Sequence, residues 1–226
     1  MKEHVDVRTD EDIKVDVVEQ LRWDDRVDAS RVQVSVVERL VTLEGAVSSN
    51  AARDAALDDA SGIRGVLAVA NKLRVEPRPS PVPPTDEELR DGIHRVFGLD
   101  SVLNETDVSA SVEDGVVTLK GSVDAFWKMG RAQELIAGFA GVREVKNQLA
   151  VVPTEDYVDQ ALAENLTSAL ERNALVDTET VTVEAENGVV TLTGTVPDWH
   201  AFRAAFHTAT HTAGVVELNN RLVVYP

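Results

Sequence analysis

The sequence has no cysteine, few aromatic residues and no long hydrophobic run. Among its 226 residues are three Trp, two Tyr and five Phe. The lack of cysteine excludes disulfides and thiolate metal ligands. No apolar run approaches the roughly 18 residues that a membrane span needs, and the first residues, MKEHVDVRTDEDIKVD, lack the apolar core of a secretory signal. We therefore expect a soluble, cytoplasmic protein, with envelope association left open.

Basic residues are also scarce. The chain has 22 Lys and Arg against 39 Asp and Glu, for a net charge of −17. A field of that sign repels nucleic acid and anionic lipid surfaces, so nucleic acid is not an expected partner. The sequence carries no nucleophile motif, phosphate-binding glycine loop or metalloprotease helix. These absences predict a protein that is not an enzyme and has no cofactor.

One phrase occurs three times: LVTLEGAV at 40–47, VVTLKGSV at 116–123 and VVTLTGTV at 189–196. Each phrase contains a glycine, which we call the anchor glycine: Gly45, Gly121 and Gly194. Each lies 26 residues before an asparagine (71−45, 147−121 and 220−194). A spacing kept in three copies indicates one small domain built three times. We name the three domains copy one (9–76), copy two (85–152) and copy three (154–225).

The same element order is predicted for each copy. Thr9, Thr85 and Thr154 precede acidic residues, as N-caps of a first helix do. Apolar residues spaced by four then predict one buried helical stripe: Ile13, Val17, Leu21; Leu89, Ile93, Phe97; Val158, Leu162, Leu166. Alternating strands, a hairpin, a second helix and a third strand follow. The sequence therefore predicts an α+β fold of three αββαβ sandwiches, each a mixed three-stranded sheet covered on one face by two helices.

The copies differ at several points. Copies two and three have Asp114-Gly115 and Asn187-Gly188 at the hairpin, whereas copy one has Glu38-Arg39, for which we expect a different turn because arginine is costly at positive φ. Copy three has four extra residues between its cap and Gly194, expected in the first helix or in the loop near Asn173. In all three copies the anchor glycine is predicted to let a helix approach the sheet.

The segment between copies one and two, PRPSPVPP at 77–84, holds five of the eight prolines. Such a segment favours polyproline II, which spans about 25 Å over this length. Between copies two and three the proline is Pro153. We therefore expect copy one to stand apart on a spacer, and copies two and three to touch.

These residues resemble the BON domain, named for bacterial osmotically induced and nodulation proteins. Copy two carries the fullest match. It consists of residues 115–123, which include Gly115 and Gly121, then Gly141-Val142, and last the segment NQLAV that starts at Asn147. Copy three matches through Gly188, Gly194, Gly214 and Asn220, and copy one through Gly45, Gly65 and Asn71. The resemblance implies the αββαβ unit, no enzymatic activity, and roles in osmotic or envelope stress. It also implies association with phospholipid membranes or, for other members, ligand-binding modules such as potassium sensors.

Three sets of residues are candidate sites. Asn71, Asn147 and Asn220 share a strand face with apolar residues, and each amide is expected to tie down a neighbouring loop or helix end. His200, His207 and His211 lie on one helical stripe of copy three and are candidate ligands for Zn, Ni or Cu, with solvated polar residues as the alternative. Asp198 and Glu217 are further candidate ligands.

The third set is aromatic and lies at the start of the second helix. Phe126, Trp127, Trp199 and Phe202 are predicted to form a binding surface, with packing between copies two and three as the favoured alternative. Trp23 is expected to pack locally. The leading functional hypothesis is a binding and assembly protein that makes weak multivalent contacts with a phospholipid membrane or a protein partner. The alternative is a cytoplasmic protein that responds to K⁺ or a divalent cation.

Overall fold

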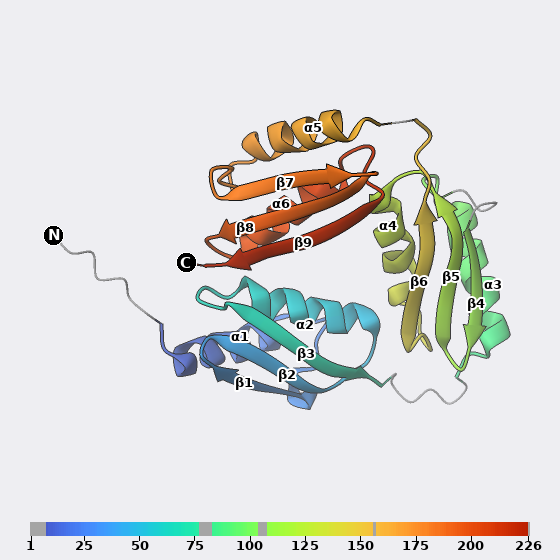
Figure 1. The fold of residues 1–226 in the computed structure, drawn as a ribbon. Coiled ribbons are helices and arrows are strands. Elements are labelled where there is room, and N and C mark those ends of the chain that lie inside the picture. Colours follow the sequence, from blue (N-terminus) through green and yellow to red (C-terminus); the bar gives the residue numbers. More distant parts are fainter. Residues whose placement is uncertain (1–7, 77–82, 104–107, 156, 226) are drawn as a thin grey trace.

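The computed structural model describes residues 8–76, 83–103, 108–155 and 157–225, which form three similar units (Figure 1). Copy one consists of α1 (Asp10–Trp23), β1 (Val32–Val37), β2 (Leu40–Val47), α2 (Asn50–Gly62) and β3 (Ala68–Val75), with a short 3-10 turn at Ala29–Arg31. Copy two consists of α3 (Asp86–Leu99), β4 (Val108–Glu113), β5 (Val116–Val123), α4 (Phe126–Ala137) and β6 (Glu144–Val151). Copy three consists of α5 (Asp159–Glu171), β7 (Val181–Glu186), β8 (Val189–Val196), α6 (Trp199–Thr210) and β9 (Glu217–Val224).

Each unit has a three-stranded sheet with the returning strand in the middle. The first two strands are antiparallel and the last two are parallel, in the orders β1-β2-β3, β4-β5-β6 and β7-β8-β9. A parallel pair needs a crossover connection, which the second helix supplies. The predicted α+β sandwich is therefore confirmed in all three copies.

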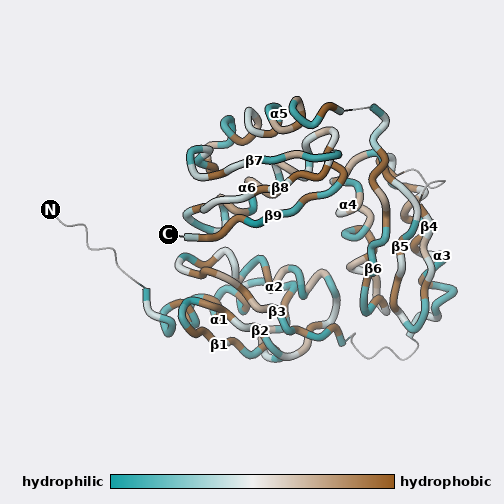
Figure 2. The backbone as a smooth tube through the Cα atoms, in the orientation of Figure 1, coloured by the Kyte–Doolittle hydropathy of each residue, from teal (hydrophilic) through white to brown (hydrophobic). Residues whose placement is uncertain are grey.

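The cores follow the predicted periodicities. In copy one the helical stripe Ile13, Val17 and Leu21 packs against Val41 and Leu43 of the central strand, and all five side chains are buried. Hydrophobic and hydrophilic residues alternate along the chain in Figure 2, which agrees with one buried face per element. Each copy thus has a core of its own.

The hairpin turn is the same in all three copies, so the expectation of a different turn in copy one is wrong. Glu38 and Arg39 have φ of 52° and 63°, Asp114 has 50° and Asn187 has 52°. A carboxylate from the first helix holds each turn. Both backbone N–H groups of each turn donate to it, and the distances are 2.7–3.0 Å for Asp10, Asp86 and Asp159. These contacts allow Arg39 to occupy a position that otherwise favours glycine.

The anchor glycines have a different role from the one predicted. Gly45 and Gly194 have φ of 120° and 122°, and a Cβ there would lie 2.1 Å from the carbonyl oxygen of Arg31 and 2.0 Å from that of Thr180. The close neighbour is therefore the backbone that enters the first strand, which in copy one is the end of the 3-10 turn Ala29–Arg31, and not one of the two α-helices that cover the sheet. In copy three this approach lets the N–H of Thr195 donate to the Thr180 oxygen at 3.1 Å.

Gly121 is the anchor glycine of copy two, and it has the same conformation, with φ of 119°. It pairs with Val108 at the start of β4, as Gly45 pairs with Val32 at the start of β1. Gly121 is exposed, so no helix in the described part of the chain packs on it. The prediction that the anchor glycines let a helix approach the sheet is therefore wrong in all three copies. What the position requires is the positive φ that glycine adopts readily.

The first helix of copy three begins later than the predicted N-cap, Thr154, indicated. The N-cap of α5 is Val158, which is 71 % exposed, and the buried stripe is Leu162, Leu166 and Leu170. Asp159 precedes Gly194 by 35 residues, as Asp10 precedes Gly45. The four extra residues therefore lie before the helix, and the predictions of a longer helix or a longer loop near Asn173 are wrong.

The three copies pack around their second helices. In Figure 1, α2 and α4 lie toward the middle of the molecule, whereas α3 and α5 lie outside. The α2 helix contacts both α4 and α6. Most of the predicted proline spacer, residues 77–82, lies outside the described residues. The expectation that copy one stands apart is wrong, because copy one touches both of the other copies.

Candidate functional site at the junctions between copies

Equivalent residues make the contacts between copies. Asn50, Phe126 and Trp199 are each the first residue of a second helix. The Asn50 amide donates to the carbonyl oxygen of Val142 in copy two at 3.5 Å. Phe126 packs against the cores of copies two and three, and Trp199 packs against the cores of copies three and one. The contacts therefore run from one to two, two to three, and three to one, in a head-to-tail arrangement that closes.

The receiving surfaces are also equivalent. Each is formed by the residues that come just after a glycine in the sequence. These glycines are Gly65, Gly141 and Gly214, and all three have φ between 90° and 99°. Leu67 of copy one packs against the core of copy three, and Val216 of copy three packs against the core of copy two. The Gly-Val step that repeats in the sequence thus serves a junction between copies as well as the fold of each copy.

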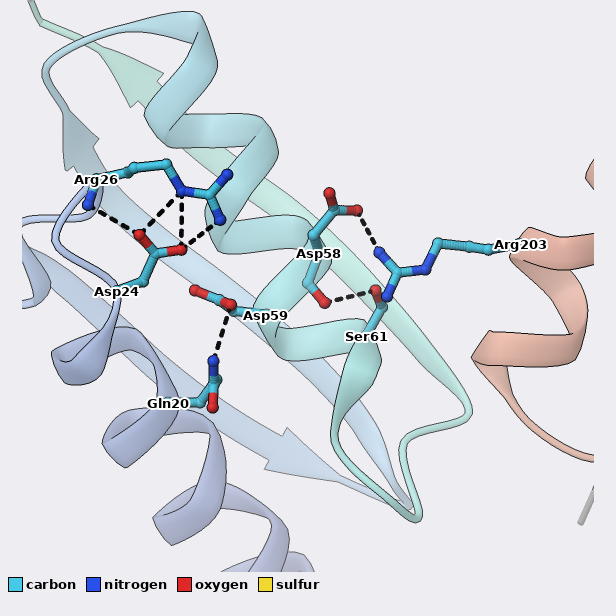
Figure 3. Close-up of polar contacts among 7 residues, drawn as sticks. All are labelled: Gln20, Asp24, Arg26, Asp58, Asp59, Ser61 and Arg203. Atoms are coloured by element: carbon cyan, nitrogen blue, oxygen red, sulfur yellow. Dashed lines mark hydrogen bonds and ion pairs between the residues drawn. The ribbon is translucent and has the colours of Figure 1, made fainter. Parts of the chain in front are cut away.

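The junction of copies three and one also has an ion pair. Arg203 on α6 reaches Asp58 on α2, with an Nη1 to Oδ1 distance of 2.7 Å (Figure 3). Both side chains are largely exposed, so the pair contributes at most about 1 kcal/mol. It is one of the contacts that join α6 to α2.

A second polar cluster in Figure 3 joins α1 to α2 inside copy one. The guanidinium of Arg26 donates to Asp24 and lowers the pKa of that carboxyl to about 2. Burial raises the pKa of Asp59 on α2, whose Oδ1 accepts the Gln20 amide at 3.1 Å. The cluster fastens the C-terminal end of α1 to α2 and, being internal to copy one, does not form part of a junction.

A cleft of about 240 Å³ lies between copies one and three. Its walls come from the loop after α2, from the hairpin turn of copy one and from the start of α6. They include Arg39, Arg64, Trp199 and His200. The indole Nε1 of Trp199 is buried and has no hydrogen-bond acceptor among the described residues.

A larger groove of about 450 Å³ separates copies two and three. Trp127 of α4 stacks on His211 with ring centroids 5.8 Å apart, and His211 stacks on His207 at 4.0 Å. A ring nitrogen of His211, Nδ1, lies 2.9 Å from the backbone oxygen of His207. Phe206 and Glu134 also line this groove.

The histidine stripe does not form the predicted metal site. Among the described residues, no group of three or more His, Cys, Asp or Glu side chains is placed to hold a metal ion. His207 and His211 stack face to face at one end of α6, whereas His200 is in its first turn, beside Asp198. The candidate ligand Glu217 begins β9. The length of α6 separates the His200 ring at its start from the His207 and His211 rings at its end, so one ion cannot bind all three histidines.

The repeated asparagines bridge the third strand to the second helix in two copies. The amides of Asn71 and Asn147 donate to the backbone oxygens of Arg53 and Met129 at 3.2 and 2.8 Å. Their Oδ1 atoms accept the N–H of the residue two positions on. Asn220 keeps the second contact, with Leu222, but its Nδ2 is buried and has no acceptor among the described residues.

The predicted aromatic surface is divided between the junctions. Phe126 and Trp199 pack between copies, and Trp127 stacks on His211 of copy three. The ring centroids of Phe202 and Trp199 lie 4.6 Å apart. By contrast, Trp23 does not pack locally as expected, because it is 85 % exposed. Leu99, at the equivalent end of α3, is 81 % exposed. Sequence reasoning assigned Trp23 to local packing and did not single out Leu99; the signal that links them is their shared position at the end of the first helix.

No helix in the described parts of the chain combines the length and apolar character needed to cross a membrane. A family model described as "BON domain" matches residues 9–77, 85–153 and 158–226. Among solved structures, CdsD, a structural protein of the Type III secretion system of Chlamydia trachomatis, is 16% identical, with a TM-score of 0.27 over 95% of this chain and 93% of that one. That likeness is too low to carry an argument.

Two curated relatives are similar in sequence. "Osmotically-inducible protein Y" of Escherichia coli (strain K12) is 30% identical over 128 residues, which are 55% of this chain. The match spans 64% of that relative's length. "Outer membrane lipoprotein DolP" of Haemophilus influenzae is 31% identical over 160 residues, which are 69% of this chain and 82% of that protein.

Proposed function

Since this chain belongs to the BON-domain family, we propose that it is a non-enzymatic binding protein of osmotic or envelope stress that contacts phospholipid membrane through weak, multivalent contacts. The names of the two relatives, one osmotically inducible and one an outer membrane lipoprotein, support this proposal. The expected cytoplasmic location has no support from these names, and the outer membrane lipoprotein supports the proposal of a role at the envelope.

One observation carries the membrane contact. The aromatic residues at the start of the second helices already make contacts in the junctions between copies. By contrast, Trp23 and Leu99 remain almost fully exposed at the ends of α1 and α3. A large apolar side chain in water at the end of a helix is a suitable anchor for an interface. Copy three has Arg172 at the equivalent position, so two anchors are available on one chain. Two weak anchors that reach one membrane at the same time bind more tightly than either does alone.

Charge determines which lipid these anchors suit. The net charge of −17 opposes approach to an anionic leaflet, and this repulsion weakens as salt screens it. We therefore expect binding to neutral phospholipid at low salt, and to anionic phospholipid only when ionic strength is raised. Apolar insertion, which salt does not weaken, provides the attraction.

Vesicle flotation tests the proposal. The chain is floated with phosphatidylcholine vesicles and with vesicles containing phosphatidylglycerol, at low and high salt. The double variant Trp23→Ser/Leu99→Ser should lose most of the binding, whereas Val223→Ser, an exposed apolar residue on β9, should keep it. Absence of binding to both lipids at both salt concentrations would refute the membrane contact and favour a protein partner.

A further inference from the structure

The cleft between copies one and three has two arginines that the other junctions lack. Arg39 replaces the turn glycine found as Gly115 and Gly188 in the other copies, and Arg64 stands where they have Ala140 and Ala213. Arg39 has φ of 63°, a conformation that is costly for a residue with a side chain. The Asp10 carboxylate holds this turn through both of its N–H groups, and the substitution places a guanidinium in the cleft where the other copies have no side chain.

The guanidinium of Arg39 is only partly engaged. Its Nε donates to the backbone oxygen of Gly65 at 2.7 Å, which fixes the plane of the group. Its terminal nitrogens have no acceptor among the described residues, and neither does the side chain of Arg64. A fixed guanidinium with free terminal donors suits a carboxylate or phosphate, because it can offer two parallel N–H groups.

Trp199 supplies a third donor to the lining of the cleft. Its indole lines the cleft, and its buried N–H has no acceptor in the described part of the chain. Leaving a buried donor unsatisfied is unfavourable, so an acceptor atom brought by a ligand would be stabilised there. The indole face and the side chains of Ile63, Pro197 and Val224 supply apolar contact.

The cleft contains two positively charged side chains, although the whole protein has a negative net charge. Arg39 and Arg64 are cationic, and the Asp198 carboxylate already caps α6 by accepting the N–H of Ala201 at 2.9 Å. The volume of about 240 Å³ lies below the roughly 300–1,000 Å³ usual for drug-sized ligands, which limits a ligand to a body of about one ring. We propose that this cleft binds a small organic anion, with its oxyanion on the two arginines and the Trp199 N–H, and its apolar body against the face of that indole. This site does not depend on membrane contact.

Titration followed by NMR and calorimetry tests the site, with benzoate and phenyl phosphate as probes and benzamide as the neutral match for benzoate. The chain has three Trp, so three indole N–H signals are expected, and Trp199→Phe identifies the signal of Trp199. We expect benzoate or phenyl phosphate to move the Trp199 signal with saturation and to leave those of Trp23 and Trp127 in place. Benzamide should bind at least about tenfold more weakly.

Two variants test the arginines without disturbing the fold. Arg39→Gly recreates the turn of the other copies and Arg64→Ala recreates their loop residue, so both should fold. Each should weaken binding about tenfold or more, while Arg95→Ala, an exposed arginine on α3, should not. Saturable binding that Arg39→Gly and Arg64→Ala leave intact, equal binding of benzamide, or no shift of the Trp199 signal would each overturn the proposal.

Discussion

Asp159 and Gly188 lie 29 residues apart, and the Gly188 N–H donates to the Asp159 carboxylate at 3.0 Å. The other carboxylate oxygen accepts the N–H of Asn187 at 2.7 Å. The first residue of α5 therefore fixes the β7–β8 hairpin turn, and Asp10 and Asp86 do the same in their copies. This contact couples the start of a helix to the register of a hairpin, and it is present three times in the chain.

The first prediction concerns the pH dependence of copy three. Hydrogen bonds from Gly188 and Asn187 lower the pKa of Asp159, so its folded pKa lies below its unfolded value of about 3.9. The stabilisation from this carboxylate is present above pH 4 and is lost as the pH falls through the lower, folded value. Asp159→Asn should therefore lower the melting midpoint by several degrees at pH 7, and the difference from wild type should shrink below pH 4.

Glu179→Ala is the control for that measurement, because it removes an exposed acid from the same copy. It should leave the midpoint nearly unchanged at every pH. A deficit of Asp159→Asn that is the same at pH 7 and pH 3 would show that the carboxylate charge is not the cause.

The fold of each copy could be predicted because its signals are local. Alternation in β2 and the stripe on α1 place Val41, Leu43 and Ile13 in the core, as the structure confirms. The role of Asp159 could not be predicted, since an acid in the first turn of a helix is already explained by the helix dipole. The N-cap of α5 was misplaced because Thr154 is a better capping residue than Val158, yet α5 begins at Asp159 and buries Leu162, Leu166 and Leu170.

The junction of copies two and three was predicted from the aromatic residues and the short linker, and Phe126 and Trp127 do contact copy three. The two junctions of copy one were not predicted, because residue type does not reveal which neighbour a surface meets. Asn50, Phe126 and Trp199 occupy one repeat position with three different chemistries, and their shared role is visible only in space. Arg39 was recognised as a departure from the repeat. Its position beside Trp199 depends on ring closure, which no local pattern encodes.

The second prediction concerns the anchor glycine. Gly194→Ala would place a Cβ 2.0 Å from the Thr180 oxygen at φ of 122°, so the backbone must shift. We expect a loss of at least about 3 kcal/mol in the free energy of unfolding, measured by urea denaturation. Gly130→Ala is the control: no atom lies within 4 Å of its Cβ in α4, and it should gain about 1 kcal/mol. Equal effects of the two substitutions would contradict the role of the Thr180 contact.

The third prediction compares two repeated asparagines. Asn147→Ala removes hydrogen bonds to both Met129 and Leu149, so it should cost about 2 kcal/mol. Asn220→Ala removes one bond, to Leu222, together with a buried amide that has no acceptor in the described residues, so it should cost less than about 1 kcal/mol. Urea denaturation gives both values, and a larger loss at Asn220 would contradict the assignment.

The last prediction tests closure of the three copies. Leu67 packs against the core of copy three without belonging to the core of its own copy, and Arg203 pairs with Asp58 across the same junction. The double variant Leu67→Ser/Arg203→Ala removes both contacts and leaves Trp199 on the core of copy one, so it should weaken the junction of copies three and one while each copy stays folded. A closed chain of this length has a radius of gyration of about 17 Å, and small-angle scattering should show a clear increase in the variant. Leu175→Ser, on an exposed loop of copy three, is the matched control and should leave the radius unchanged. An unchanged radius in the double variant would show that contacts other than Leu67 and Arg203 hold the ring closed.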